Sequence, residues 1–340
     1  MTTSLPWLAL DIGGANLKAA HTTGGARTLP FELWKRPEEL PNSLERLAAT
    51  LPPADRVAVT MTAELCDCYP TKAAGVLDVL AAVEVAFSGR LIRIWGTDGR
   101  FHTVAEVEAA PALAAASNWV ALATLAARLL PEGPGLLIDV GSTTADLIPV
   151  RDGKPAPRGR TDTQRLRAGE LVYAGVRRTP VCALATELFW RGAATGLSAE
   201  LFATTLDVYL TLGELAPDVA DLSTADGRPA TVEAARDRLA RMVGADRDGF
   251  HEADALGLAQ AADDALMARL EAASNRACLA AVGRPSGAVV AGSGAFLARR
   301  LAARVVEPGG PIVELDQAWG PVASSAGCAH ALMVLAGEEA

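Results

Sequence analysis

One pattern occurs twice in this chain, and the repeat constrains the fold more than any other feature of the sequence. Residues 8–18 read LALDIGGANLK and residues 136–146 read LLIDVGSTTAD. A shift of 128 positions aligns three pairs of residues, Asp11 with Asp139, Gly13 with Gly141, and Gly25 with Gly153. Each copy predicts a buried strand that ends in aspartate, a turn of small residues and a second strand. A duplicated hairpin of this kind predicts a two-lobed protein with a ligand cleft.

The turns of the two hairpins contain the residue types that bind phosphate groups. Backbone N–H groups in a glycine turn can contact phosphate oxygens, because no Cβ atom blocks the approach. The aspartate at the end of each first strand can hold a hydrated Mg²⁺ ion, which usually takes one or two protein carboxylates. We therefore expect Asp11 and Asp139 to bind Mg²⁺. The residues expected to contact a diphosphate or nucleotide are Gly13, Gly14, Asn16, Gly141, Ser142, Thr143 and Thr144.

A third segment, VVAGSGA at residues 289–295, predicts a strand, a glycine turn and the start of a helix. A helix N-terminus after such a turn can support a phosphate or a flat ring. Gly292, Ser293 and Gly294 are therefore further candidates for nucleotide binding, and ATP or ADP stays open as a ligand.

Charge and composition narrow the class of partner. The chain has 340 residues, half of them apolar, with a formal charge of −9 and a pI near 5.1. An acidic protein of this kind is not expected to bind nucleic acid or an anionic membrane. No apolar run reaches the roughly eighteen residues of a membrane span, the first residues lack the basic start of a signal peptide, and scattered cysteines fit a reducing compartment. We expect a cytoplasmic protein that binds a small phosphorylated molecule, with a homodimer as one open oligomeric state.

Four ionisable residues are candidates for catalysis: Asp11, Lys18, Glu64 and Asp146. Lys18 is one of only four lysines, against 27 arginines, and it lies in the first hairpin as a phosphate contact or as a strand-edge charge. Asp146 takes the equivalent position in the second copy. Glu64 follows a predicted strand, and ligands bind at the carboxyl ends of strands in open α/β sheets. Glu64 is therefore a candidate base, with a surface turn residue as the alternative.

Further polar residues are candidates for substrate binding. Asn118 opens a predicted helix before the second hairpin, where it is either a ligand contact or only a cap. The run at residues 166–181, LRAGELVYAGVRRTPV, contains adjacent arginines, which suit bidentate contacts to an oxyanion unless they are simply solvated. The candidates in this run are Glu170, Tyr173, Arg177 and Arg178, and a later loop adds Asp226 and Arg228.

The remaining pattern predicts an α/β protein with a helical insertion. Helices are expected at 37–51, 71–87, 204–212, 231–243, 253–282, from 295, and at 324–335, and strands at 56–61, 91–95 and 287–291. The first lobe is expected at 1–112, with a C-terminal helix at 321–340 packing back on it. The second lobe is expected at 113–320, and its helical insertion at about 160–280.

The ordered motifs DIGGxxxK, DVGSTTxD and VVAGSGA resemble the phosphate-one, phosphate-two and adenosine motifs of the superfamily of actin, heat-shock chaperones and hexokinase. The resemblance runs from residue 8 to about residue 300. It implies an actin-like ATPase fold of two ribonuclease-H-like lobes with the ligand between them. It also implies that Asp11 and Asp139 face one another across the cleft.

Several segments resemble a narrower family, the tetrahydromethanopterin-linked one-carbon transfer pathway protein, a relative of the hydantoinase/oxoprolinase group. The segments are ALDIGGANLKAA, MTAELCDCYPTKAAGV, AASNWVALA, LIDVGSTTADLIPV, GELVYAGVRRTPV and TADGRPATVEAARDRLARMVGAD. The family is similar to the archaeal enzyme of methanofuran biosynthesis that joins an aminomethylfuran-methyl diphosphate to γ-glutamyltyramine. That reaction forms an aryl ether and releases pyrophosphate, so the resemblance implies an alkyl(aryl) transferase with a phenolic amine as acceptor.

The implied reaction gives the candidate residues roles. Mg²⁺ held by Asp11 and Asp139, together with Lys18 and the glycine turns, would bind and stabilise the departing pyrophosphate. Glu64 or Asp146 would take the proton of the phenol, whose pKa near ten makes its removal useful.

The glutamyl carboxylate of the acceptor would suit Arg177 or Arg178.

Two other functions stay open. One is an ATP-dependent small-molecule kinase or a hydantoinase/oxoprolinase-type ATPase that uses the same aspartates on magnesium-nucleotide. The other is a nucleotide-binding regulator without small-molecule chemistry, because the fold alone does not fix function.

Overall fold

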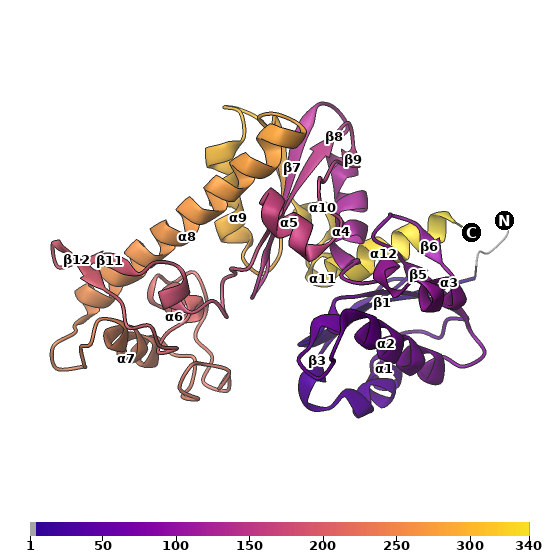
Figure 1. The fold of residues 1–340 in the computed structure, drawn as a ribbon, viewed down its shortest axis with the longest axis horizontal. Helices are drawn as coiled ribbons and strands as arrows, with labels where there is room; N and C mark the ends of the chain where they lie inside the picture. The colour runs from indigo at the N-terminus through magenta and orange to yellow at the C-terminus, as the bar shows by residue number, and fades with distance from the viewer. Residues whose placement is uncertain (1–4, 340) are drawn as a thin grey trace.

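Two mixed β-sheets covered by helices form the protein, as seen in a computed structural model that describes residues 5–339 (Figure 1). The first sheet has the order β3-β2-β1-β4-β5-β6. Because β1 pairs antiparallel with β2 and parallel with β4, the first hairpin lies in the middle of this sheet. The strands are β1 (Trp7–Ile12), β2 (Asn16–His21), β3 (Ala26–Pro30), β4 (Arg56–Met61), β5 (Leu91–Trp95) and β6 (Phe101–His102).

The second sheet repeats this arrangement around the second hairpin. Its order is β10-β8-β7-β13-β14, and β9 also pairs with β8. β13 lies parallel to β7 as β4 lies parallel to β1, so the expected fold of two ribonuclease-H-like lobes is confirmed. The strands are β7 (Pro134–Val140), β8 (Ala145–Arg151), β9 (Lys154–Pro155), β10 (Leu171–Val172), β13 (Gly287–Ala291) and β14 (Ile312–Glu314).

Each face of the first sheet packs against a different set of helices. Side chains of β1 alternate between the faces, so Leu8 and Leu10 contact one core while Trp7 and Ala9 contact another. The helices that cover the outer core are α1 (Leu40–Ala48), α2 (Lys72–Ala86) and, at its edge, α3 (Val104–Ala109).

Two helices between the sheets join the lobes into one core. They are α4 (Asn118–Ala126) and α12 (Gly327–Glu338), which pack against each other, and α12 also packs on β1. Their apolar side chains share a cluster with Ala9 of the first sheet and Leu137 and Val289 of the second. Burial of the apolar side chains in this shared cluster stabilises the position of one hairpin relative to the other.

A helical insertion extends from the second lobe. Figure 1 shows α8 running outward from the lobe to the hairpin of β11 and β12, with α6 and α7 beside it. The insertion contains β11 (Glu187–Trp190), β12 (Ala193–Gly196), α6 (Thr205–Thr211), α7 (Val232–Met242) and α8 (Glu252–Ala281). The remaining helices of this half are α5 (Asp162–Ala168), α9 (Ala295–Val305), α10 (Leu315–Trp319) and α11 (Pro321–Ser325).

The expected bounds hold for β4, β5 and β13, and those of α2, α6, α7 and α8 differ from expectation by one residue at each end. The helix predicted at 37–51 is wrong at its start, because residues 37–39 form a 3-10 turn and α1 begins at Leu40. The final helix begins at Gly327 rather than at 324. The divisions of the chain at 112/113 and 320/321 remain predictions. Within residues 5–339, no helix combines the length and apolar character needed to cross a membrane.

Candidate functional site

A cleft of about 530 Å³ lies between the lobes, and both hairpins contribute to its walls. It brings together residues from β1, β2, the turn after β4, the start of α4, the second hairpin and α5. The predicted site residues that line it are Asp11, Gly13, Gly14, Asn16, Lys18, Glu64, Asn118, Thr143, Thr144, Asp146, Tyr173 and Arg178. Its further lining includes Trp34, Trp119, Asp162 and Arg165, which the sequence did not single out as functional.

Strand register pairs the acidic end of each hairpin with a charged residue. In the first hairpin Asp11 lies opposite Lys18, and in the second Asp139 lies opposite Asp146. The carboxylate of Asp11 is 6 % exposed and accepts a hydrogen bond of 3.3 Å from the side-chain amide of Asn118. Asn118 therefore contacts a site residue rather than acting only as a helix cap.

The electrostatics of these residues are coupled across the two hairpins. Burial, followed by the charge of Asp146, raises the pKa of Asp139 to about 7. Burial also raises the pKa of Asp11, against the opposing effects of Lys18 and Asn118. Burial disfavours the charged form of Lys18, but Asp11, Cys328 and Asp139 outweigh it and raise the pKa of that ammonium. Lys18 thus supplies positive charge to both aspartates.

In each lobe a segment that follows the hairpin forms backbone hydrogen bonds to the hairpin turn. We call these the bracing segments, residues 31–33 in the first lobe and residues 176–178 in the second. In the first lobe the N–H groups of Phe31 and Leu33 donate to the carbonyls of Ala15 and Gly14, at 3.0 Å each. In the second lobe the N–H of Val176 donates to Gly141 at 3.0 Å, and those of Arg177 and Arg178 both donate to Ser142. The N–H groups of Gly13 and Gly141 close the turns by donating to the carbonyls of Asn16 and Thr144, so within residues 5–339 the free backbone donors of the turns include those of Gly14 and Thr143.

The two bracing segments also approach one another across the cleft. Trp34 directly follows the first brace, and the guanidinium of Arg178 in the second lies 5.8 Å from its ring centroid. Both residues line the cleft. A cation over an indole face is an attractive contact, so this pair closes one side of the cleft while leaving the guanidinium edge available to an anion.

Glu64 is a buried carboxyl group in the wall of the cleft. It lies in the 3-10 turn Ala63–Leu65 after β4 and is 1 % exposed. Within residues 5–339 neither of its carboxyl oxygens has a hydrogen-bond partner. α2 packs against this turn at Gly75, where a Cβ atom would lie 2.6 Å from the backbone oxygen of Glu64. Burial raises the pKa of Glu64 to about 7, which is the range that suits a general base.

Arg165 neutralises the second-lobe carboxylate Asp146. The guanidinium of Arg165, on α5, is 2 % exposed, forms an ion pair with Asp146 and lies 4.0 Å from the ring centroid of Trp119. Because Asp146 already binds a cation, it is a weaker candidate for the base than the unpartnered Glu64.

An ion pair joins the lobes next to Glu64. The ammonium of Lys72, at the start of α2, donates to Asp162 at the start of α5 over 2.7 Å. Tyr173 lies in the same region, where burial and then Asp162 raise the pKa of its phenol. Asp162 and Tyr173 line the cleft together with Glu64.

Some predicted phosphate contacts lie behind the cleft wall rather than in it. Asp139, Gly141, Ser142, Gly292, Ser293 and Gly294 are not among the lining residues. Gly292 has a φ of +89°, and a Cβ atom there would overlap Val140 and the carboxylate of Asp139, so this turn packs directly on the end of β7. The glycines of this turn therefore serve close packing in this arrangement.

Four predicted substrate contacts lie outside the cleft and have structural partners. Glu170 accepts hydrogen bonds from the backbone N–H groups of Arg158, at 2.5 Å, and Gly159, at 3.0 Å. Arg177 pairs with Asp221. Asp226 and Arg228 belong to an ion-pair network with Asp207, Asp237 and Arg238 in the insertion.

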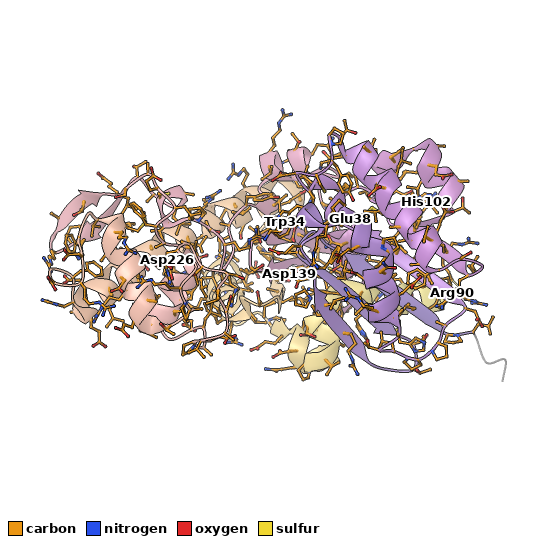
Figure 2. The ribbon with its side chains drawn as sticks, turned by 90° about the horizontal axis from the view of Figure 1, so that it is seen from below. Trp34, Glu38, Arg90, His102, Asp139 and Asp226 are labelled. Carbon is orange, nitrogen blue, oxygen red and sulfur yellow. The ribbon has the colours of Figure 1, made fainter. Side chains whose placement is uncertain are left out.

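Figure 2 shows Asp226 far from Asp139 and Trp34, which lie near the middle of the molecule. The adjacency of these arginines and aspartates in sequence predicted an anion site, but in the fold each cation is already bound to a carboxylate. Arg178 is the exception, because it lines the cleft while its neighbour Arg177 forms the ion pair with Asp221.

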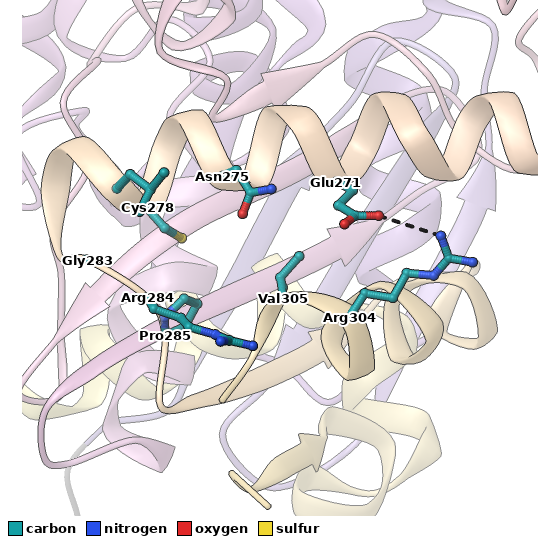
Figure 3. A pocket seen from close by; sticks show the side chains of 9 residues that line it. Glu271, Asn275, Cys278, Gly283, Arg284, Pro285, Arg304 and Val305 are labelled. Carbon is teal, nitrogen blue, oxygen red and sulfur yellow. Dashed lines mark ion pairs between the residues drawn. The ribbon is translucent and has the colours of Figure 1, made fainter. Parts of the chain in front are cut away.

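A smaller hollow, of about 270 Å³, lies away from the hairpins between the ends of α8 and α9. Figure 3 shows it, with Glu271 and Arg304 forming an ion pair of 3.5 Å across its mouth. Its walls contain no part of either hairpin, so we assign the site to the cleft between the lobes.

The chain is similar to known proteins over most of its length. The family model described as hydantoinase/oxoprolinase matches residues 55–334. The (4-{4-[2-(γ-L-glutamylamino)ethyl]phenoxymethyl}furan-2-yl)methanamine synthase of Methanocaldococcus jannaschii is 38% identical over 244 residues, which cover 71% of this chain and 72% of that protein. The protein of the same name from Methanococcus vannielii is 34% identical over 124 residues, or 36% of this chain and 55% of that one.

Among solved structures, nucleotide-free acetone carboxylase superposes with a TM-score of 0.53 at 11% identity, covering 97% of this chain and 70% of the other. At this identity the similarity concerns the fold alone.

Proposed function

This chain belongs to the hydantoinase/oxoprolinase family, and from that membership and the geometry of the cleft we propose that it is an aryl-ether synthase that releases pyrophosphate. The 38%-identical relative is named for such a product, in which a phenol oxygen is joined to a furan-methyl carbon. The proposed substrates are an aminomethylfuran-methyl diphosphate and the phenol of γ-glutamyltyramine. The observation that carries the proposal is Glu64, a buried carboxyl group in the same cleft as the duplicated hairpin, whose oxygens have no hydrogen-bond partner within residues 5–339. Burial raises the pKa of Glu64, and the backbone N–H groups of Glu64 and Ala116 only partly lower it.

The proposed reaction is a displacement at the furan-methyl carbon. The phenol oxygen forms a bond to this carbon, the bond from the carbon to the diphosphate oxygen breaks, and pyrophosphate leaves with the electron pair. The phenolic proton passes to the carboxylate of Glu64. Because the pKa of Glu64 lies near 7, the group is substantially ionised at neutral pH and basic enough to accept a proton as the ether forms.

The turns of the two hairpins are the proposed diphosphate site. Gly13, Gly14, Thr143 and Thr144 line the cleft, and the turn carbonyls behind them are already bound by the bracing segments. The free backbone N–H groups and the hydroxyls can donate to phosphate oxygens. Lys18 adds a buried positive charge beneath them. Charge placed in advance around a leaving group lowers the barrier to its departure.

Charge balance supports a bound Mg²⁺ ion. The lining contains five carboxyl groups, Asp11, Glu64, Asp67, Asp146 and Asp162, but three cationic side chains, Lys18, Arg165 and Arg178. A diphosphate would add further negative charge to this surface. We propose that Asp11 in the cleft wall and Asp139, which lies behind that wall, hold Mg²⁺, since this ion commonly takes one or two protein carboxylates together with phosphate oxygens. Mg²⁺ when bound would neutralise phosphate charge in the leaving group.

Product analysis tests the proposal. Pure protein is incubated with the furan diphosphate, γ-glutamyltyramine and Mg²⁺, and the mixture is analysed for the ether by mass spectrometry and for pyrophosphate by a coupled assay. We expect the two products in equal amounts. The absence of ether, with ADP formed when ATP is added, would favour the ATP-dependent alternative.

A further inference from the structure

A second cavity, of about 650 Å³, adjoins the catalytic cleft at Trp119, which lines both spaces. Three segments form it: the turn at residues 97–99 in the first lobe, the face of α4, and residues 153–160 in the second lobe. We call it the rear cavity. Trp119 is held in place by the guanidinium of Arg165 on the cleft side, 4.0 Å from the ring centroid. Trp119, which is 4 % exposed, therefore lies at the boundary between the two spaces.

The rear cavity presents opposite charges from opposite lobes. Asp98 extends from the first lobe, and Arg160 extends from the second and donates to the backbone oxygen of Thr97 at 3.3 Å. In residues 5–339 Asp98 and Arg160 form no ion pair with one another. Asp98 accepts hydrogen bonds from His102, at 3.0 Å, and from the N–H of Arg100, at 3.3 Å. Burial works against the charge of Asp98, but His102 outweighs it and lowers the pKa of this carboxyl.

The other cations of the cavity differ in their availability. Arg128 is neutralised by Glu338, through two hydrogen bonds of 2.6 and 2.7 Å. Lys154 is exposed, and within the described part of the chain neither it nor Arg160 has a carboxylate at ion-pair distance. The cavity therefore offers a carboxylate and two free cations at its rim.

The wall of the cavity between these charges is of mixed polarity, with Thr124 beside apolar residues. Trp119, Val120 and Pro157 contribute carbon surface to it. The indole N–H of Trp119 is buried and has no hydrogen-bond partner within residues 5–339. A ligand that fits this pattern has a flat or aliphatic body and one positive and one negative group at its far end.

The acceptor of the proposed function has this pattern. A γ-glutamyl amide leaves the α-ammonium and the α-carboxylate of the glutamyl group free, so this end is a zwitterion at neutral pH, and an amide and a short chain connect it to the phenol. We propose that the rear cavity binds the α-amino-acid end of the acceptor, with Arg160 contacting its carboxylate and Asp98 its ammonium, while the phenol passes Trp119 into the cleft. This inference rests on the proposed function and adds the residues that select the acceptor.

Calorimetric binding tests the inference independently of turnover. The intact wild-type chain is titrated with γ-glutamyltyramine and with tyramine, which lacks the glutamyl group. We expect the glutamyl compound to bind at least about tenfold more tightly, because charge-assisted hydrogen bonds contribute most of the difference. Asp98→Asn and Arg160→Gln should each remove most of this preference and leave the affinity for tyramine unchanged. Equal affinities for the two compounds in the wild type, or a preference unchanged in both variants, would overturn the inference.

Matched variants separate a specific effect from a general one. Arg167→Gln changes an exposed arginine of α5, and Asp248→Asn changes an exposed aspartate of the insertion, and neither residue lines the two spaces. Both controls should keep the preference for the glutamyl compound. A loss of affinity for both compounds in Asp98→Asn and Arg160→Gln would indicate altered folding and count against the inference.

Turnover then distinguishes failure of this inference from failure of the proposed function. With the furan diphosphate present, both variants should raise KM for γ-glutamyltyramine by about tenfold or more and leave KM for the diphosphate unchanged. Ether formation by the wild type with an unaltered KM in the variants contradicts the rear-cavity assignment alone. An intact binding preference without any ether contradicts the proposed function alone.

Discussion

Asp146 occupies in the second hairpin the position that Lys18 occupies in the first. Each is the register partner of the aspartate that ends the preceding strand. The duplicated scaffold therefore places an ammonium in one lobe and a carboxylate in the other at equivalent points. Arg165 supplies the cation that the second hairpin lacks, from a helix outside the repeat. The first hairpin thus carries one carboxylate and one cation, whereas the second carries two carboxylates and one cation, and we infer that the first lobe offers its cation directly to a ligand.

Glu64→Gln should separate activity from stability. The glutamine cannot accept the phenolic proton, so kcat should fall by about 10²- to 10⁴-fold. In the wild type, kcat should rise with pH through about 7 as the raised pKa of Glu64 is passed. Kinetics from pH 5.5 to 8.5 measure both effects, and Glu38→Gln, a change in the turn before α1, is the control.

The same substitution should stabilise the fold at alkaline pH. The folded-state pKa of Glu64 lies above its unfolded value, so the neutral form favours folding at low pH and this advantage is lost as pH rises through about 7. Glutamine stays neutral at every pH. At pH 8 the unfolding free energy of the Glu64→Gln variant should therefore exceed that of the wild type by up to about 3 kcal/mol. Urea unfolding at pH 5 and pH 8 measures the difference; a variant less stable than the wild type at pH 8 would contradict the buried, unpartnered state of the carboxyl.

Asp11→Asn and Asp139→Asn should weaken the response to Mg²⁺. Each removes one of two carboxylates proposed to hold the ion, so half-saturation should require at least about tenfold more Mg²⁺ and kcat should fall. Calorimetric titration with Mg²⁺ in the presence of pyrophosphate measures the affinity. Asp55→Asn, at an exposed aspartate, should behave as the wild type. Unchanged Mg²⁺ affinity in both site variants would rule out this pair as the ligands.

Lys18→Gln should weaken pyrophosphate binding. The change removes a buried positive charge next to two carboxylates, so an incoming anion meets a more negative site. The dissociation constant of pyrophosphate should rise by about tenfold or more, the range of one charge-assisted contact. The exposed Lys35, paired with Glu32 at 3.0 Å, provides the matched Lys35→Gln control. Equal affinities in the two variants would place Lys18 outside the anion site.

Arg165→Met should destabilise the fold. It leaves Asp146 without its cation and removes the stacking contact with Trp119, which together should lower the unfolding free energy by about 3 kcal/mol. Arg167→Met, on the exposed side of the same helix, should change it by no more than about 0.5 kcal/mol. Denaturant unfolding of both variants measures the contrast, and similar stabilities would show that the ion pair contributes little.

The sequence predicted the scaffold of the site because that scaffold is local and repeated. The offset from Asp11 to Asp139 could be read directly, and the strand register then follows from the turn. Glu64 could be placed because a residue at the carboxyl end of a central strand faces the ligand edge of a sheet. The positions of these residues depend on contacts between residues that are close in sequence.

The remaining site residues depend on tertiary contacts that no local pattern contains. Trp34 and Arg178 meet because two bracing segments from different lobes approach one another. Arg165 lies on the short helix α5, whose local signals are the capping box of Thr161 and Gln164 and the C-cap glycine Gly169, and neither indicates a functional role for Arg165. Arg228 looked available in the sequence, but its charge is taken up by Asp226, two residues earlier, and by Asp237 on α7.

Oxygen labelling tests the central claim most directly. The furan diphosphate is prepared with ¹⁸O in the bond between its methylene carbon and the diphosphate, and it is incubated with the protein, Mg²⁺ and unlabelled γ-glutamyltyramine. We predict that the label appears in pyrophosphate and that the ether contains only the phenol's unlabelled oxygen. Label retained on the furan-methyl carbon would show that a phosphorus–oxygen bond breaks instead, and it would contradict the ether-forming displacement proposed for this cleft.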